Sequence, residues 1–296
     1  MSGTEHLLTE VVGHTLVVTM NRPEAKNALS PAMIVGLADA WVRLNEDDDI
    51  RCAILTGSGG SFCTGMDLKA RANDDAGPNP YQERWAADPD LHWKALLRHY
   101  RIRKPLIAAV EGYAVAGGTE ILQATHLRVA GESATFGVFE AKRGLFPVGG
   151  STVRLQRQIG YTNALEMLLT ARGYTAAEAK EIGLIGHVVP DGQAMTKALE
   201  LAEMICANGP LAVEAILKSV QETAAMSEVD ALKLEFEIGW PIFATNDSKE
   251  GPRAFAEKRA PNWTRTRPGT NSPLCTFGST CRNPKYRVAV FTHFGR

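Results

Sequence analysis

Two glutamates in apolar surroundings are the first candidates for chemistry. Glu120 opens a mostly apolar run in AAVEGYAVAGGTEILQATHLRV (Ala108–Val129), and Glu140 lies in a weakly polar stretch between Phe136 and Phe146. A charged carboxylate buried without partners costs several kcal/mol, so each residue needs a structural partner or a task. A helix cap or a salt bridge would be the structural explanation. The catalytic explanation is that both carboxylates converge on one water molecule, one as base and the other as acid.

Two glycine-rich turns, SFCTGMDLKA (Ser61–Ala70) and VAGGTE (Val115–Glu120), each follow a buried strand pattern. Glycine supplies positive φ, which explains them as ordinary turns. The alternative is that small residues leave backbone N–H groups bare, able to donate to a developing oxyanion. The second turn also begins a helix, so its N–H groups gain the positive end of the helix dipole.

Other catalytic motifs are incomplete or missing. The stretch TGSGGSF (56–62) lacks the third glycine of GxGxxG and the GK[ST] of a phosphate-binding loop. No serine stands in GxSxG, no histidine in HExxH, and the five cysteines form no CxxC pair. These absences argue against nucleotide binding, serine hydrolysis and a metal site. Glu111 also follows an apolar strand, and we assign it no chemistry.

The composition is that of an ordinary globular protein, with 45% hydrophobic and 22% charged residues. No apolar run approaches the length of a membrane span. The first residues, MSGTEHLLTE, carry acids where a secretory signal carries bases and an apolar block, which predicts a cytoplasmic protein. Residues 265–296 hold six of the 32 Lys and Arg and none of the 33 Asp and Glu, so residues 1–264 have a net charge of −7. This acidic body gives no reason to expect nucleic acid or a membrane as a partner.

Short apolar runs bounded by turn residues predict strands. Leu7–Val12 and Thr15–Met20 form an expected hairpin around Gly13-His14. The other expected strands are Cys52–Thr56, Leu106–Val110, Leu127–Ala130 and His187–Val189.

Helix signals follow these strands. Ser30-Pro31 combines an N-cap with a first-turn proline, and Thr175 with Glu178 forms a capping box. The expected helices are residues 31–45, Tyr81–Arg103, two turns from Thr119, Ser151–Ile159, Asn163–Thr170, Thr175–Ile182 and most of 194–259. Repeated strand–helix units followed by a helical segment indicate an α/β fold.

Six stretches in chain order carry a resemblance to a known family. They are NRPEAKNALS, FCTGMDLK, AVAGGTEILQATHLRVAGESATFG, LFPVGGSTVRL, TAAEAKEIGLIGHVV and GPRAFAEKRAP. Through these motifs the chain, from Leu7 to Trp263, resembles the enoyl-CoA hydratase/isomerase (crotonase) superfamily and looks most similar to its actinobacterial hydratases.

The resemblance implies a crotonase-like spiral of ββα units. Residues 1–193 would form this core with the active site, and residues 194–264 a helical region that assembles homotrimers, often paired as hexamers. Residues 265–296 run past the usual end of the family. They are acid-free and rich in Pro, Thr, Ser and Asn, and we expect a disordered extension without a function.

The resemblance also implies roles for single residues. Met66 and Gly117 would donate backbone N–H groups to the thioester oxygen of an acyl-CoA substrate. The residues that would line the CoA adenine and pantetheine by main-chain contacts are Thr64, Met66, Asp67, Leu68 and Lys69. Those that would lie near the CoA phosphates are Lys26 and, from the C-terminal region, Phe255 or Lys258. Because CoA is part of the substrate, no separate cofactor is expected.

Members of the superfamily differ in their carboxylates. Hydratases carry glutamate at both positions matched here by Glu120 and Glu140, whereas isomerases generally lack the first. The chain is therefore expected to hydrate trans-2-enoyl-CoA to 3-hydroxyacyl-CoA, in fatty-acid or steroid side-chain β-oxidation. Two alternatives stay open: isomerisation by Glu140 alone, and acyl-CoA binding without turnover. Residues Ala72–Tyr100, with an acidic loop and two tryptophans, are expected to cover the acyl pocket.

Overall fold

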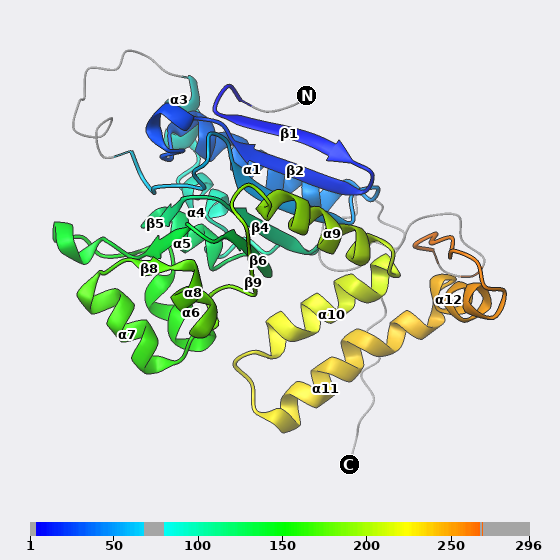
Figure 1. The fold of residues 1–296 in the computed structure, drawn as a ribbon. Coiled ribbons are helices and arrows are strands. Elements are labelled where there is room, and N and C mark those ends of the chain that lie inside the picture. Colours follow the sequence, from blue (N-terminus) through cyan, green and yellow to red (C-terminus); the bar gives the residue numbers. More distant parts are fainter. Residues whose placement is uncertain (1–3, 68–79, 267, 269–296) are drawn as a thin grey trace. The chain divides into compact units, whose positions relative to one another are not determined.

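The computed structural model describes residues 4–67, 80–266 and 268 (Figure 1). The chain divides into two compact units, Met1–Asn208 and Gly209–Arg296. The sequence placed this boundary before residue 194. The first unit extends further because helix α9 (Ala194–Cys206) buries Ala194, Ala198 and Ala202 against strand residues of the main sheet. The apolar face expected in this helix therefore serves the sheet.

A six-stranded sheet organises the first unit, in the order β1-β2-β3-β4-β6-β9. Its strands are β1 (Leu7–Val12), β2 (Thr15–Met20), β3 (Cys52–Gly57), β4 (Leu106–Val110), β6 (Leu127–Gly131) and β9 (His187–Val189). The first two pair antiparallel, and the other neighbours are parallel. Each strand was predicted to within one residue. The buried parallel strands are continuous apolar runs, and β1 and β2 were predicted from the turn signal between two β-rich runs.

A second sheet was not predicted. It has three strands in the order β5-β7-β8: β5 (Tyr113–Val115), β7 (Thr135–Gly137) and β8 (Tyr174–Thr175). Two or three residues are too few to display an alternating pattern. Cys63 pairs with β5, since Cys63 N–H donates to Tyr113 O at 2.8 Å and Val115 N–H donates to Cys63 O at 3.0 Å. This pairing brings the two glycine-rich turns side by side.

The helices of the first unit surround these sheets. They are η1 (Pro23–Ala25), α1 (Pro31–Glu46), α3 (Pro80–Ala87), α4 (Leu91–Ala95), α5 (Gly117–Leu122), η2 (Ala141–Arg143), α6 (Ser151–Gln158), α7 (Tyr161–Thr170), α8 (Ala176–Glu181) and α9. The predicted caps are both present: the Ser30 hydroxyl accepts from Met33 N–H at 3.2 Å, and Thr175 and Glu178 form a capping box.

Glu111, to which we assign no chemistry, has a structural role. Its Oε1 accepts the N–H groups of Gly192 at 3.0 Å and Ala194 at 3.1 Å, at the start of α9. A carboxylate at this position accepts hydrogen bonds from backbone N–H groups that have no partner within the helix, and its charge interacts favourably with the positive end of the helix dipole.

The single helix expected over residues 81–103 is wrong. Helix α3 ends at Ala87, and α4 begins only at Leu91. Pro89 lies between them, and proline both lacks an N–H and disfavours a helical conformation in the residue before it. Leu97, with φ 51°, lies in the left-handed region just beyond α4.

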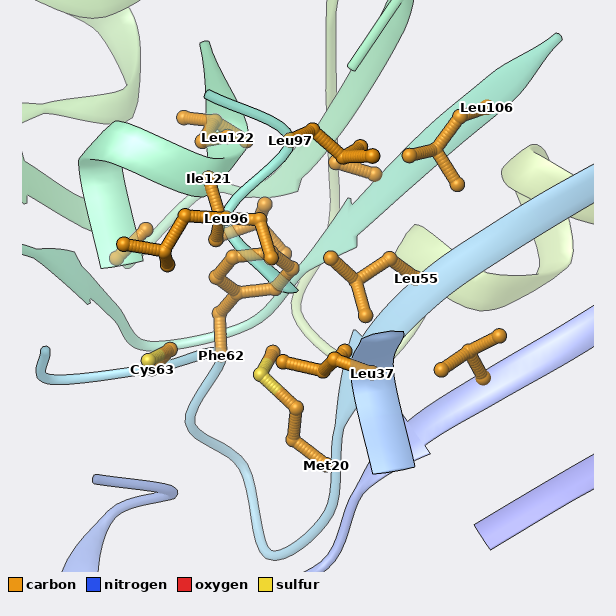
Figure 2. Close-up of a cluster of buried hydrophobic side chains, with 14 of the residues drawn as sticks. Met20, Leu37, Leu55, Phe62, Cys63, Leu96, Leu97, Leu106, Ile121 and Leu122 are labelled. Atoms are coloured by element: carbon orange, nitrogen blue, oxygen red, sulfur yellow. The ribbon is translucent and has the colours of Figure 1, made fainter. Parts of the chain in front are cut away.

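A buried apolar cluster fixes the position of α5 (Figure 2). Ile121 and Leu122 of this helix are fully buried together with Phe62, Met20 of β2 and Leu55 of β3. Burying such a side chain stabilises the fold by about 1.5–3 kcal/mol. Residue 120 therefore projects from a helix that is anchored by its two following residues.

The second unit is helical. It contains α10 (Pro210–Thr223), α11 (Glu228–Gly239), η3 (Trp240–Ala244) and α12 (Asp247–Ala256). Arg265 is buried in this unit, where its Nη2 lies 2.8 Å from Glu214 Oε1 and its N–H donates to the Asp247 carboxylate. The disorder expected from residue 265 onward is therefore wrong for Arg265, which an ion pair holds in place. Residues 267 and 269–296 lie outside the described residues. In the described parts of the chain, no helix is long and apolar enough to cross a membrane.

Candidate active site

The Met66 amide is oriented by Leu29. Leu29 N–H donates to Gly65 O at 2.8 Å, and Asp67 N–H donates to Leu29 O at 3.4 Å. The C=O and N–H groups of a trans peptide point in opposite directions. Because the Gly65 carbonyl points at Leu29, the N–H of Met66 points away from it. Among the described residues, that N–H has no acceptor.

The Gly117 amide is oriented by Ala116, which has φ 51° and ψ −125°. Such a conformation costs a non-glycine residue about 1–3 kcal/mol and is characteristic of functional sites. Ala116 N–H donates to Gly137 O at 2.8 Å, and its carbonyl accepts Glu120 N–H at 3.0 Å. By the same peptide geometry, Gly117 N–H points out of the helix N-terminus, and no described residue accepts it.

The two amides are neighbours. A Cβ added to Gly65 would lie 2.8 Å from Gly117 N, and a Cβ added to Gly117 would lie 3.7 Å from Met66 N. Gly65 also has φ 85°. Both explanations for the glycine turns therefore hold at Gly65, which needs positive φ and also lets the Gly117 amide approach. Two adjacent bare N–H groups can bind one oxyanion.

A cavity of about 500 Å³ has Met66, Gly117, Glu120 and Glu140 in its lining. Much of the remaining wall is apolar or aromatic and consists of His92, Trp93, Leu96, Phe139, Leu145 and Phe146. An apolar cavity with a few convergent polar groups is typical of small-molecule sites.

Glu120 is almost completely buried on α5, with 5% of its surface exposed. Its Oε1 accepts Ser151 N–H at 3.4 Å. Burial, and then the negative charge of Glu140, raise the pKa of Glu120 to about 7. Both carboxyl groups line the same cavity, and the first can exchange a proton near neutral pH.

Glu140 precedes helix η2, and its side chain caps no helix. Its Oε2 atom is buried and has no hydrogen-bond partner among the described residues. Burial raises the pKa of this carboxyl group as well. Neither Glu120 nor Glu140 forms an ion pair within the described parts of the chain. The salt-bridge explanation therefore fails for both residues, and the cap explanation fails for Glu140. Glu120 keeps one contact of the capping kind, because it accepts the N–H of Ser151, the first residue of α6.

The family model described as enoyl-CoA hydratase/isomerase matches residues 12–266. The chain belongs to this family. The chain is 61% identical to enoyl-CoA hydratase EchA19 of Mycobacterium tuberculosis over 256 residues, which cover 86% of this chain and 95% of the relative. It is 38% identical to (E)-benzylidenesuccinyl-CoA hydratase of Thauera aromatica over 257 residues, 85% and 96% of the two chains.

Solved structures of the family have the same fold. The crystal structure of an enoyl-CoA hydratase from Mycobacterium tuberculosis H37Rv matches with a TM-score of 0.78 and 43% identity, covering 88% of this chain and 99% of that one. The expected crotonase-type α/β fold and the similarity to actinobacterial hydratases are thereby confirmed. Assembly through the helical C-terminal region stays a prediction.

Three of the residues predicted to bind CoA line the cavity: Lys26, Thr64 and Met66. Lys26 Nζ lies 4.3 Å from the centre of the Tyr113 ring. The Thr64 hydroxyl donates to the carbonyls of Ala25 at 3.4 Å and Lys26 at 3.3 Å. These bonds fix the turn that carries Lys26 against the turn that carries Met66.

Of the other residues predicted to bind CoA, Asp67 is the one in the described part of the first unit. The Asp67 side chain pairs with Arg22, at 2.6 Å. Leu68 and Lys69 lie outside the described residues. Phe255 and Lys258 belong to the second unit, in which Phe255 is exposed. The roles of these residues toward CoA stay predictions.

From the sequence we expected Ala72–Tyr100, with its two tryptophans, to cover the acyl pocket. One of the two tryptophans lines the cavity. Trp93 lines the cavity, while Trp85 stacks on His92 with ring centres 5.1 Å apart. Phe146 and Gly149 also line it and were missed. The only signal for the latter was the glycine pair in LFPVGGSTVRL.

Proposed function

We propose that this protein is an enoyl-CoA hydratase that adds water across the double bond of a trans-2-enoyl-CoA. The observation that carries the proposal is the lining of one cavity by two bare amides and two carboxyl groups, that of Glu120 buried and that of Glu140 half-buried. The relatives named above, both called hydratases, support the same reaction.

In this proposal the thioester oxygen accepts the N–H groups of Met66 and Gly117. Withdrawal of electrons through the conjugated system makes C3 of the acyl group electrophilic. Enolate-like charge grows on the oxygen in the transition state, so the amides bind the transition state more tightly than the substrate. Losing one such donor typically costs about 3 kcal/mol.

The carboxyl groups then move two protons. Glu120 accepts a proton from a water molecule whose oxygen forms a bond to C3, and Glu140 gives a proton to C2. The product is a 3-hydroxyacyl-CoA formed by syn addition, and a proton passing from Glu120 to Glu140 restores the starting state. A pKa of about 7 at Glu120 suits an acid–base group that works near neutral pH.

We also propose the class of acyl chain that the protein accepts and its oligomeric state. The apolar and aromatic wall favours an acyl chain from fatty-acid or steroid side-chain β-oxidation. The second unit leaves several large apolar side chains exposed: Ile216, Val220, Val229, Leu232 and Phe236. Apolar surface of this kind supports a homotrimer or a dimer of trimers. We also propose a cytoplasmic location for the protein.

A panel of short, long and ring-bearing trans-2-enoyl-CoA thioesters tests the function. We expect loss of the absorbance of the conjugated thioester and a 3-hydroxyacyl-CoA of matching mass. A 3-enoyl-CoA converted to its 2-enoyl isomer, with no hydration of the panel, would assign an isomerase. Tight acyl-CoA binding without any product would assign a binding protein.

A further inference from the structure

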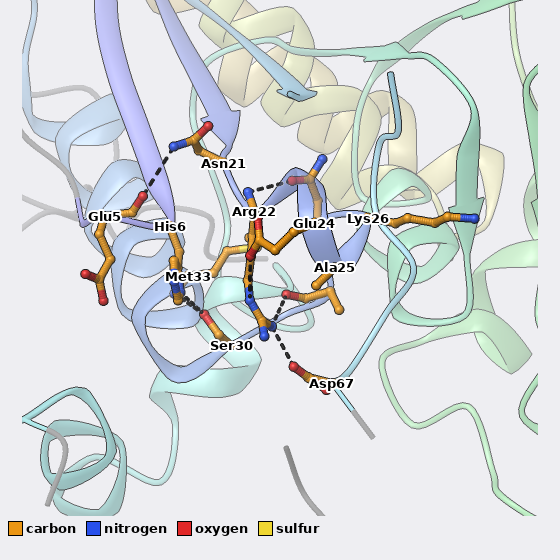
Figure 3. A network of polar contacts seen from close by, with 12 residues as sticks. Glu5, His6, Asn21, Arg22, Glu24, Ala25, Lys26, Ser30, Met33 and Asp67 are labelled. Carbon is orange, nitrogen blue, oxygen red and sulfur yellow. Dashed lines mark hydrogen bonds and ion pairs between the residues drawn. The ribbon is translucent and has the colours of Figure 1, made fainter. Parts of the chain in front are cut away.

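Arg22 and Asp67 form an ion pair next in the chain to Met66, and Figure 3 shows the two side chains facing each other. Arg22 Nη1 is 2.6 Å from Asp67 Oδ2, and the two side chains are only 20% and 12% exposed. Asp67 follows Met66 in the chain. Charges that are mostly withdrawn from solvent are screened less than exposed ones, so this pair is stronger than a surface salt bridge.

The two hydrogen bonds that hold Met66 to Leu29 are unequal. The bond on the Gly65 side measures 2.8 Å, and the bond on the Asp67 side measures 3.4 Å, beyond the ordinary N–H···O range. The peptide on the Asp67 side is therefore the weaker attachment. The ion pair acts on the residue that has this weaker bond.

Arg22 is itself fixed to the neighbouring turns. Its N–H donates to Asn27 Oδ1 at 2.7 Å, and Asn27 Nδ2 donates to the carbonyls of Ser58 at 2.9 Å and Ser61 at 2.6 Å. A second, longer contact joins Arg22 Nε to the exposed Glu24 carboxylate at 3.5 Å. Figure 3 shows Lys26 extending away from this network. The network thus joins the end of β2 to both ends of the loop that carries the amide.

We propose that Arg22 and Asp67 are positioning residues of the oxyanion hole. Their ion pair holds the peptide after Met66, so that the Met66 N–H keeps its direction into the cavity. The inference rests on the proposed function of that cavity. It gives the Asp67 side chain a task that differs from contact with CoA.

Neutralising the side chain of Arg22 or Asp67 should let the Met66 N–H change direction, although the N–H group itself is still present. Complete loss of an oxyanion donor lowers kcat by roughly 10²–10³-fold, so a misdirected donor should lower kcat about tenfold. KM should change less than about threefold, because the interaction strengthens mainly in the transition state.

The test compares Arg22→Gln, Asp67→Asn and the double variant with Arg22→Lys, which keeps the charge. Each is measured for kcat and KM, for Tm, and for the absorption shift of a bound chromophoric enoyl-CoA, such as one with a 4-dialkylaminophenyl group on C3. Polarisation of the thioester oxygen moves that absorption to longer wavelength, whether or not turnover occurs. The matched control is Arg84→Gln, which breaks an exposed pair with Asp39 on α1.

We expect both single variants and the double variant to show the same tenfold loss of kcat and a smaller absorption shift. Arg22→Lys should keep most of both, and Arg84→Gln should match the wild type. The proposal is overturned if the single variants keep the wild-type absorption shift, if only KM or Tm changes, or if the losses multiply in the double variant. Should Arg22→Gln fail to fold, the isosteric Asp67→Asn decides. If the wild-type protein hydrates no enoyl-CoA, the proposed function is refuted. The absorption shift of the bound thioester then still tests whether the ion pair positions the Met66 amide.

Discussion

The Glu120 carboxylate lies against the backbone of Gly149, where an added Cβ would fall 2.3 Å from Glu120 Oε2. Real Cβ atoms do not approach an oxygen so closely, so any larger residue must displace the carboxylate or the chain that faces it. Gly149 thereby sets the limit of the space in which the Glu120 carboxyl group can lie.

Gly149→Ala should therefore lower kcat at least about tenfold by moving Glu120 from its productive position. The effect is measured as kcat on a trans-2-enoyl-CoA together with Tm. Gly186→Ala is the control, because its Cβ would meet nothing closer than Arg128 O at 3.7 Å. Equal kcat for the two variants would mean that Glu120 tolerates displacement.

Glu120→Gln and Glu140→Gln should each lower kcat by at least about 10²-fold, the low end of acid–base contributions. Steady-state hydration of crotonyl-CoA and longer enoyl-CoAs measures it. Glu111→Gln is the matched control, since that carboxylate caps α9 and faces Gly192 and Ala194. It should lower Tm and keep kcat. Wild-type rates in both active-site variants would refute the roles given to these two residues.

The raised pKa of Glu120 makes stability depend on pH. A carboxyl with a pKa of about 7 when folded and 4.5 as its ordinary value binds the proton more tightly in the folded state. Its contribution to stability therefore falls as pH rises from about 4.5 to about 7, by roughly 3 kcal/mol. Glu120→Gln lacks this titration, so its stability relative to wild type should improve by that amount between pH 4 and pH 8. Urea unfolding at both pH values measures it, and a constant difference would show that Glu120 titrates normally.

Gly65→Ala should lower kcat about 10²-fold, because its Cβ would lie 2.8 Å from the Gly117 nitrogen and block that donor. Positive φ alone would also destabilise the variant. Gly60→Ala separates the two effects: Gly60 has φ 72° with nothing within 4 Å of an added Cβ. We expect both variants to lose Tm, Gly65→Ala more because of its additional backbone clash, and only Gly65→Ala to lose kcat.

Truncation after Thr266 should keep wild-type Tm and hydration, whereas truncation after Thr264 should not. The shorter chain loses Arg265 and leaves the Glu214 carboxylate, 2% exposed, without this partner. Breaking a buried pair typically costs about 3–5 kcal/mol. Denaturant unfolding compares the chains, and Glu214→Gln should restore part of the loss in the shorter one. Equal stability of the two truncated chains would show that the pair contributes nothing.

The sequence predicted what local patterns encode. Continuous apolar runs gave the strands of the main sheet, and Ser30 and Thr175 gave two helix starts. The apolar surroundings of Glu120 and Glu140 also indicated buried carboxylates, and both line the cavity.

Other features depend on contacts between distant segments. The strand Tyr113–Val115 exists because Cys63 and β7 pair with it, and its three residues have no pattern of their own. Nothing in the type of Ala116 indicates φ 51°, which tertiary contacts impose. The burial of Arg265 likewise comes from Glu214, a residue far away in sequence. The interruption at Pro89 was different, since proline is a local signal and could have been read.

The pairing of Cys63 with β5 determines when, during folding, the protein becomes able to bind an enolate oxygen. The Met66 and Gly117 amides come from segments that are remote in sequence and meet only through this pairing. A fragment with one turn alone would therefore stabilise no enolate. During refolding, the absorption shift of a bound chromophoric thioester should appear when these segments dock, later than helical structure that forms locally.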